Sequence, residues 1–183
     1  MTQNIEIEFK TIIPLATYQH LLKQFDLENN IFKQVNHYFD TDDYVLNQNQ
    51  IVLRIRQKGE NRFKVTLKSQ SDQQAYEKHF VLSEEKARDM IQNGFHTKDF
   101  FDDIDEYVTF RVSLDNYRVS TPYEGGTLFL DRCDYCNVTD YELEYEANNY
   151  EEGKIVFEKL LSNCNIDFTP IKRKSERAFT CRR

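Results

Sequence analysis

The sequence predicts an α+β fold in which antiparallel strands outnumber helices. Several segments alternate apolar and polar residues, which is typical of strands with one buried face. A few others carry apolar residues at three- and four-residue spacings, as amphipathic helices do. Short breaks rich in Asn, Asp, Gly and Ser separate these segments, and no linker or repeat interrupts them. Because 183 residues suit one substantial core, we expect a single domain over residues 1–183.

The first predicted strand is IEIEFK, residues 5–10, in which three apolar residues alternate with Glu6, Glu8 and Lys10. The next segment, PLATYQHLLKQF, begins with Pro14 at a position that suits the start of a helix. Its apolar residues recur at helical spacing. We therefore expect a short amphipathic helix after the first strand.

Four strand-like runs follow, and the breaks between them predict antiparallel neighbours. The sequence Lys58-Gly-Glu-Asn61 is typical of a hairpin turn. The four runs are NIFKQVNHYFDTDDYVL (30–46), QIVLRIRQK (50–58), NRFKVTLKS (61–69) and QAYEKHFVL (74–82).

From Ser83 onward the sequence predicts two helices and three strands. Ser83 is a suitable N-cap for a helix over EEKARDMIQ, which Gly94 would end. Residues 105–121 and 125–135 form a second hairpin-like pair of strands, and YELEYEA follows at 141–147. A helix over 151–163 then precedes a basic tail at 171–183. The residues of that helix that we expect in the core are Ile155, Phe157, Leu160 and Leu161.

Composition excludes some classes of function. The net charge of −7 and the pI near 5.2 argue against a surface for nucleic acid or an anionic membrane. No apolar run approaches the length of a membrane span, and the start lacks the features of a signal peptide, so a cytoplasmic location is the expectation. The Cys133–Cys136 spacing matches half of a zinc site, but nothing nearby completes it. We expect reduced thiols there, without a metal.

The polar faces of the predicted strands each carry largely one sign of charge. Ordinary solvent-exposed faces mix the two signs, since like charges across neighbouring strands destabilise a sheet. Carboxylates bind hard divalent cations, whereas Lys and Arg bind phosphates, so a metal-bound polyphosphate would need both kinds of strand. A closed barrel would direct one face of every strand to a common lumen. The faces are Glu6, Glu8 and Lys10; Arg54 and Arg56; Lys64, Thr66 and Lys68; and Glu142, Glu144 and Glu146.

Successive motifs along nearly the whole chain resemble one known family. They are ExExK at Glu6–Lys10, YFDT at Tyr38–Thr41, LRIR at Leu53–Arg56, KVTLK at Lys64–Lys68, LDR at Leu130–Arg132, ELE at Glu142–Glu144 and KxKxER at Lys172–Arg177. In this order they resemble the CYTH domains of the triphosphate tunnel metalloenzyme superfamily, especially the small stand-alone CYTH proteins of Gram-positive bacteria. The resemblance implies a closed antiparallel eight-stranded β-barrel, the triphosphate tunnel, with flanking helices.

The resemblance also implies roles for individual residues. Glu8 and Lys10 are the implied catalytic residues, and Mg²⁺ or Mn²⁺ is the implied cofactor. The implied metal ligands are Glu6, Glu8, Glu142 and Glu144. The implied substrate-binding residues are Lys10, Arg54, Arg56, Lys64, Lys68, Arg111, Arg118 and Lys174. The sequence around Lys174 is Arg-Lys-Ser where many relatives have Ser-Lys-Tyr, so the charge is kept while the neighbouring residues differ.

Four further polar residues have simpler interpretations. Glu77 and His79 share a strand face but show no obvious partner, so we expect them to be structural or exposed. Glu146 is expected at the rim of the acidic strand or in solvent, outside the metal site. Asp131 is a weaker candidate for an acidic role.

The favoured function is metal-dependent hydrolysis of a triphosphate, either inorganic or organic such as thiamine triphosphate, with release of phosphate. One alternative is a class IV-type adenylyl cyclase, in which a ribose hydroxyl replaces water. Another is a non-catalytic sensor of polyphosphate or nucleotide. RNA triphosphatase activity is less favoured because the acidic chain offers no guiding patch. The expected partner is a small-molecule triphosphate, with no nucleic acid or membrane, and a homodimer stays an open option.

Overall fold

The computed structural model describes residues 4–70 and 75–182, and these form an α+β fold whose paired strands are antiparallel, as the sequence predicts. The chain divides into two compact units. The first unit comprises residues 4–5, 34–114 and 173–182, and the second comprises residues 6–33 and 115–172. Closure of the strands into one eight-stranded barrel, and a single domain, stay predictions.

The first unit is built on the antiparallel order β5-β4-β3-β2, with β7 paired to β2 and β6 to β7. Glycine at position 59 has φ of 65° in the turn that joins β3 to β4, which confirms the predicted hairpin. The elements are β2 (Phe32–Asp40), α2 (Val45–Gln48), β3 (Ile51–Lys58), β4 (Arg62–Gln70), β5 (Ala75–Leu82), α3 (Glu84–Asn93), β6 (Phe95–His96), the start of β7 (Tyr107–Tyr123), α5 (Lys174–Phe179) and the 3₁₀ turns Thr97–Asp99 and Thr180–Arg182.

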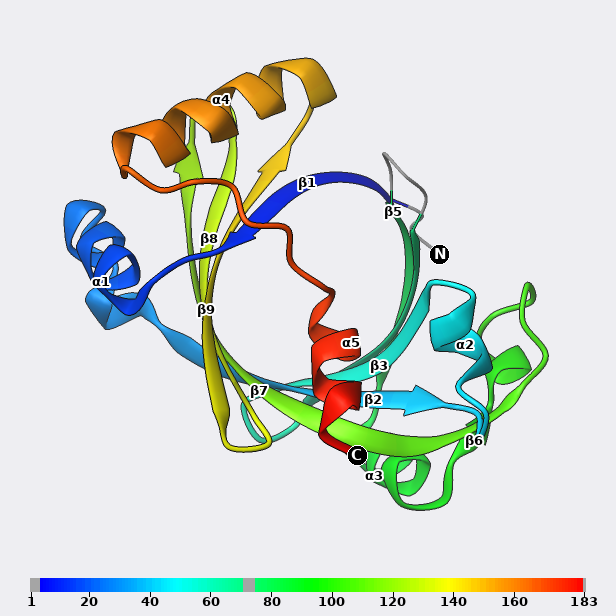
Figure 1. Ribbon diagram of the computed structural model, residues 1–183. Coiled ribbons are helices and arrows are strands. Elements are labelled where there is room, and N and C mark those ends of the chain that lie inside the picture. The colour runs from blue at the N-terminus through cyan, green and yellow to red at the C-terminus, as the bar shows by residue number, and fades with distance from the viewer. Residues whose placement is uncertain (1–3, 71–74, 183) are drawn as a thin grey trace. The chain divides into compact units, whose positions relative to one another are not determined.

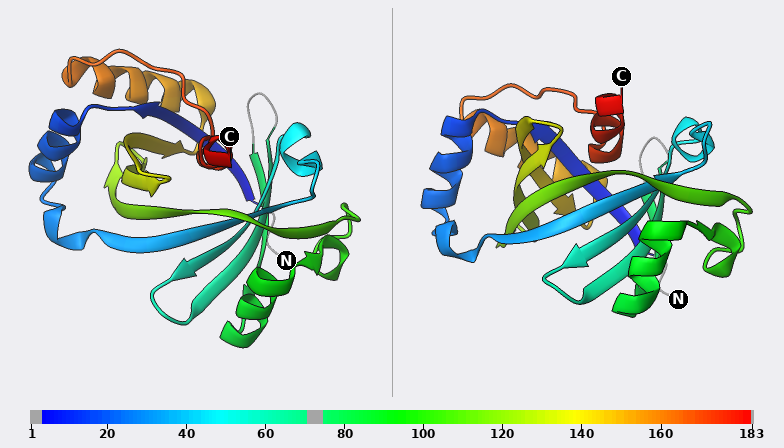
Figure 2. Two further views of the ribbon diagram at one scale, coloured as in Figure 1. Left: turned by 60° about the horizontal axis from the view of Figure 1, so that its bottom comes forward. Right: turned by 90° about the horizontal axis from the view of Figure 1, so that it is seen from below.

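Helix α3 covers the apolar face of this sheet. Ala87 and Met90 of the helix are buried with Phe63 and Val65 of β4, and Figure 2 shows the helix (green) beside the β3–β4 hairpin. The hydroxyl of Ser83 accepts a hydrogen bond from the Lys86 amide at 3.2 Å, so the predicted N-cap is confirmed. With its apolar face buried here, the sheet presents the opposite, charged face of β3, β4 and β5 away from the core.

Helix α2 interrupts a stretch that the sequence analysis interprets as strand up to Leu46. The carboxylate of Asp40 accepts hydrogen bonds from the backbone amides of Thr41, Leu46 and Asn47 at 2.8, 3.0 and 3.0 Å. Tyr44, with φ of 58°, turns the chain sharply just before the helix. Because these amides have a buried acceptor, the chain leaves β2 at Asp40 and forms one helical turn. The Asp-Thr of the YFDT motif is therefore a turn signal.

The second unit pairs its strands in the antiparallel order β1-β9-β8-β7. The turn between β7 and β8 lies where the sequence predicts it, because Tyr123 pairs with Gly126. The elements are β1 (Asn4–Ile12), α1 (Leu15–Gln24), the 3₁₀ turn Glu28–Asn30, the rest of β7, β8 (Gly126–Tyr135), β9 (Val138–Ala147) and α4 (Tyr150–Asn163).

Helices α1 and α4 cover the apolar face of the second sheet, and α4 (orange) lies over β8 and β9 in Figure 1. The core contains Leu21 of α1, Leu160 of α4 and Leu143 of β9, and burial of each such side chain contributes roughly 1.5–3 kcal/mol. The predicted core position of Ile155 is wrong, because its side chain is 66% exposed. It lies on the outer face of α4, away from Phe157 and Leu161, which are buried as predicted.

The basic tail holds a helix that the sequence analysis does not predict. Helix α5 belongs to the first unit, where the ring of Phe179 contacts the rings of Tyr38 and Tyr44 with centroids 6.1 and 5.4 Å apart. Cys133 is buried and reduced as expected, but Cys136 is disulfide-bonded, so the expected thiol there is wrong. Among the described helices, none is both long and apolar enough to cross a membrane.

Candidate functional site

The polar face of the second unit gathers acidic residues from three strands. Glu8 lies opposite Glu146 across the β1–β9 pair, and Lys10 lies opposite Glu144. Residues directly opposite in an antiparallel pair share one face, so the register brings ExExK and YELEYE together. We call this surface the acidic face. Its members are Glu8, Lys10, Arg118, Asp131, Glu142, Glu144 and Glu146.

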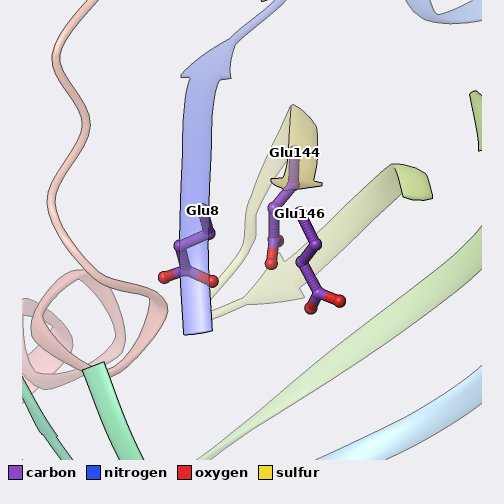
Figure 3. A group of neighbouring side chains, drawn as sticks. All are labelled: Glu8, Glu144 and Glu146. Carbon is purple, nitrogen blue, oxygen red and sulfur yellow. The ribbon is translucent and has the colours of Figure 1, made fainter. Parts of the chain in front are cut away.

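Three carboxylates on the acidic face could hold a metal ion. Oxygen atoms of Glu8, Glu144 and Glu146 all lie within 4.8 Å of one another, and Figure 3 shows the three side chains projecting into the same region from β1 and β9. The side chains of Glu8 and Glu144 are only 8% exposed. Clustered carboxylates repel one another unless a cation joins them. An all-oxygen donor set with one cluster of acids suits Mg²⁺ or Mn²⁺ rather than zinc or copper.

Glu146 belongs to this group, although the sequence analysis places it at the rim or in solvent. Its side chain is half-buried. Burial, and then the negative charges of Glu144 and Glu6, raise the pKa of Glu146 to about 7. This pKa shows how costly the third negative charge is in the absence of a metal. The structure therefore brings Glu146 together with Glu8 and Glu144, and its role toward a metal stays a prediction.

Arg118 is bound to carboxylates on the acidic face. Its guanidinium donates two hydrogen bonds to Asp131, both at 2.7 Å, and a third to Glu144 at 2.9 Å. Burial alone would lower the pKa of Arg118, but Asp131 and Glu144 raise it well above its ordinary value. Asp131 is fully buried, so the Arg118–Asp131 pair is a bidentate ion pair inside the fold. The predicted contact of Arg118 with phosphate stays a prediction.

The other predicted residues of this unit lie near the three-carboxylate group. The ammonium of Lys10 is 3.3 Å from a carboxylate oxygen of Glu8. Glu142 is 1% exposed and lies opposite Asp131, outside the group of three. Glu6 is half-buried, and its charge raises the pKa of Glu146. The metal roles of Glu6 and Glu142 stay predictions.

The polar face of the first unit gathers the predicted cations. Arg54 lies opposite Thr66 and Arg56 opposite Lys64 across the β3–β4 pair. Lys68, further along β4, lies opposite Glu77 of β5. The sequence therefore predicts correctly that these basic residues share a face. We call this surface the basic face. Its members are Arg54, Arg56, Lys64, Thr66, Lys68, Glu77 and His79.

Glu77 and His79 lie on the basic face, and their expected structural role stays a prediction. Their side chains are 13% and 27% exposed. One oxygen of Glu77 is 3.8 Å from the guanidinium of Arg54, and the other is 3.8 Å from the His79 ring. Their position on β5 could have indicated this, since the paired strand β4 presents Lys64 and Lys68 on the same face.

Two uncharged residues lie beside these cations, Thr66, which the sequence analysis places on this face, and Asn36, which it missed. Asn36 is fully buried and accepts a hydrogen bond from Nε of Arg56 at 2.9 Å, which fixes the direction of that side chain. Thr66 is also fully buried, and its hydroxyl has no hydrogen-bond partner among the residues that the structure describes. The strand alternation of β2 could have placed Asn36, since Tyr38, two residues on, lies opposite Arg54.

The last two predicted cations, Arg111 and Lys174, lie on other elements of the first unit. Arg111 of β7 donates a hydrogen bond to the backbone oxygen of Asp40 at 3.2 Å and also pairs with Asp42. Lys174 is the first residue of α5, and this helix packs on Tyr38 through Phe179. Both residues stay predicted phosphate contacts.

Comparison with known proteins supports the resemblance. The family model described as the CYTH domain matches residues 4–178. The chain is 34% identical over 182 residues to YjbK of Bacillus subtilis, a presumed triphosphatase, and the match covers 95% of this chain and 94% of that protein.

Solved structures show the same fold. A presumed adenylate cyclase of Bacillus halodurans superposes with a TM-score of 0.88 at 30% identity, over 98% of this chain and all of that one (100%). HpAC1 of Hippeastrum, a presumed adenylyl cyclase described as having a dominant triphosphatase activity, superposes with a TM-score of 0.75 at 20% identity, over 96% of this chain and 94% of that one. The family match and these relatives span the chain, and we conclude that it belongs to the CYTH domain family.

Proposed function

We propose that this protein is a divalent-metal-dependent triphosphatase. The observation that carries the proposal is the three-carboxylate group of Glu8, Glu144 and Glu146. A group of three neighbouring carboxylates favours a metal-using enzyme over a site that only binds an anion. The partner in this proposal is a small-molecule triphosphate, and no nucleic acid or membrane takes part.

In this proposal the acidic face holds Mg²⁺ or Mn²⁺. A bound divalent ion would neutralise charge on phosphate oxygens and lower the pKa of a coordinated water. Glu8, Glu144 and Glu146 supply the oxygen ligands. The ammonium of Lys10, 3.3 Å from Glu8, neutralises part of the negative charge of these carboxylates and can donate a hydrogen bond to a phosphate oxygen. Arg118 keeps Glu144 oriented through its hydrogen bond.

The basic face would bind the phosphate chain. Arg54 and Arg56 offer forked donors that match phosphate oxygens, while Lys64 and Lys68 supply point charges. Nε of Arg54 and the hydroxyl of Thr66 are buried without hydrogen-bond partners among the described residues. A bound anion would accept hydrogen bonds from both groups. As part of the same proposal, the strands close into the eight-stranded tunnel that membership of the superfamily implies.

The relatives and the charges support the proposed substrate class. YjbK, at 34% identity, bears the name of a presumed triphosphatase. We propose hydrolysis of inorganic triphosphate or of an organic triphosphate such as thiamine triphosphate, with release of phosphate. The residues of the two faces recognise the phosphate chain, so the group beyond it decides between these substrates.

The test is release of phosphate and pyrophosphate from tripolyphosphate, thiamine triphosphate and ATP, measured with Mg²⁺, with Mn²⁺ and with a chelator. We expect metal-dependent phosphate release that Glu8→Gln lowers by about a hundredfold or more, because a ligand carboxylate is lost. The matched control is Glu158→Gln, since that side chain is 64% exposed on α4. Equal activity of Glu8→Gln and the wild type would refute the site assignment.

A second candidate function is adenylyl cyclase activity, because the Bacillus halodurans relative at 30% identity is a presumed adenylate cyclase. The same assay decides between the two, since a cyclase would release pyrophosphate and cyclic nucleotide from ATP. Binding of tripolyphosphate without turnover of any substrate would favour the sensor.

A further inference from the structure

Glu77 is an acidic residue placed among the cations of the basic face. It lies on β5 directly opposite Lys68 of β4. Its carboxylate has an oxygen 3.8 Å from the Arg54 guanidinium and another 3.8 Å from Nδ1 of His79, and its side chain is 13% exposed. A single carboxylate therefore occupies space among groups that would otherwise bind an anion.

The charges around Glu77 are nearly all positive. Burial raises the pKa of Glu77, but Arg54, Lys68, Lys64 and Arg56 together lower it below its ordinary value. His79 also faces the carboxylate. Glu77 is therefore ionised at neutral pH, and its negative charge stabilises the cations on β3 and β4.

Glu77 and Arg54 form an ion pair without a hydrogen bond between the two atoms that approach most closely. A separation of 3.8 Å exceeds the roughly 2.7–3.2 Å of a hydrogen bond, so the attraction is not directional. Nε of Arg54 is buried and has no hydrogen-bond partner within the described part of the chain. A phosphate can accept two hydrogen bonds from one guanidinium, which makes it a better partner for Arg54 than Glu77 is.

We propose that Glu77 is a positioning residue: it is the resident counterion of Arg54, holding the arginine in place while the site is empty and yielding it to a phosphate group of the substrate. The inference rests on the proposed function in taking the anion to be a triphosphate. It adds that binding begins with a displacement, so the intact protein binds triphosphate more weakly than the basic face alone would allow.

The test is calorimetric binding of tripolyphosphate to the full chain in a buffer with chelator, so that no metal contributes. We expect Glu77→Gln, an isosteric change that removes the charge, to tighten binding by about threefold to tenfold. Glu60→Gln is the control, because it removes the same charge from an exposed turn of the same unit and is expected to change affinity by less than about twofold. Glu77→Asp, which keeps the charge, should leave the affinity near that of the wild type.

A double-mutant cycle separates positioning from a general charge effect. Because Glu77 acts through Arg54, its substitution should tighten binding in the wild-type background but not in the Arg54→Ala background. In turnover assays with Mg²⁺, Glu77→Gln should lower KM while kcat stays within about twofold of the wild-type value. This is expected when the substitution strengthens binding of the ground state and of the transition state equally.

The outcomes distinguish this inference from the proposed function. Weaker binding by Glu77→Gln, or the same gain in the Arg54→Ala background, overturns the counterion role whether or not the protein turns over. Tighter binding without any hydrolysis supports the counterion role and refutes the triphosphatase. Absence of tripolyphosphate binding in both the wild type and Glu77→Gln overturns both.

Discussion

The acidic and basic faces each contain residues of the opposite charge, and these are held in different ways. On the acidic face, Arg118 donates three hydrogen bonds of 2.7, 2.7 and 2.9 Å to two carboxylates. On the basic face, Glu77 approaches Arg54 and His79 only to 3.8 Å. The first arrangement is directional and includes the fully buried carboxylate of Asp131, whereas the second is an electrostatic contact. The comparison suggests that Arg118 is a fixed part of the fold and that Glu77 can exchange its partner.

The largest expected effect is on the fixed pair. Arg118→Leu should lower the free energy of unfolding by about 3 kcal/mol or more, because it leaves the buried carboxylate of Asp131 without its cation. Urea denaturation monitored by circular dichroism measures this loss. The matched control is Arg132→Leu, since Arg132 is 45% exposed and follows Asp131 in the same strand. If both variants lose the same free energy of unfolding, the buried Arg118–Asp131 pair contributes no more to stability than the exposed Arg132–Asp134 pair, and the prediction is wrong.

A smaller effect is expected from the cations of the basic face. Arg56→Ala should weaken tripolyphosphate binding by on the order of tenfold, because it removes a forked donor that Asn36 holds in place at 2.9 Å. Arg62→Ala removes the same charge from an exposed position of β4 and serves as the control. Calorimetry at two salt concentrations measures both. Equal losses in the two variants would mean that net charge, and not the arrangement of the face, governs binding.

A further effect concerns Glu146 and depends on pH. Its pKa in the fold is about 7, above the ordinary value of 4.5, so the folded state disfavours its ionised form. Stability is therefore fully present below the ordinary pKa, falls as pH rises between the two values, and levels off above the folded value. In chelator, Glu146→Gln should be more stable than the wild type at about pH 8 and equal to it near pH 4.

Urea midpoints at these two pH values measure the effect of Glu146. Addition of Mg²⁺ together with tripolyphosphate should reduce the advantage of Glu146→Gln at the higher pH, because the bound metal stabilises the carboxylate form of the wild type. A stability difference that changes neither with pH nor with Mg²⁺ and tripolyphosphate would show that Glu146 lies outside the metal site.

Much of the fold could be predicted from periodicity and turn residues. Ser83 and Gly94 bound helix α3 as expected, and both predicted hairpins form. The stretch after Asp40 could not be predicted as a helix, because the carboxylate that accepts its amides lies outside it in sequence. Ile155 fits the helical period but faces solvent, since periodicity gives spacing without saying which side a sheet will cover.

The candidate site could be predicted in its charges but not in its pairings. Alternation placed the cations of β3 and β4 on one face, as the register confirms. The neighbours of Glu146 and Glu77 could not be predicted, because a lone carboxylate on a strand is usually solvated and only the paired strand shows what it contacts. Arg118 and Asp131 pair because β7 and β8 bring them directly opposite, a register that depends on the turn at Tyr123–Gly126.

The cations beside the three-carboxylate group also set the order in which ligands arrive. Two of its members already have a neighbour of opposite charge, Lys10 at 3.3 Å from Glu8 and Arg118 at 2.9 Å from Glu144. These cations offset part of the attraction that the carboxylates would exert on a bare divalent ion. An ion that carries phosphate oxygens brings its own anionic ligands. We expect metal and triphosphate to bind as one species, so that Mg²⁺ titrated alone binds much more weakly than Mg²⁺ titrated with tripolyphosphate.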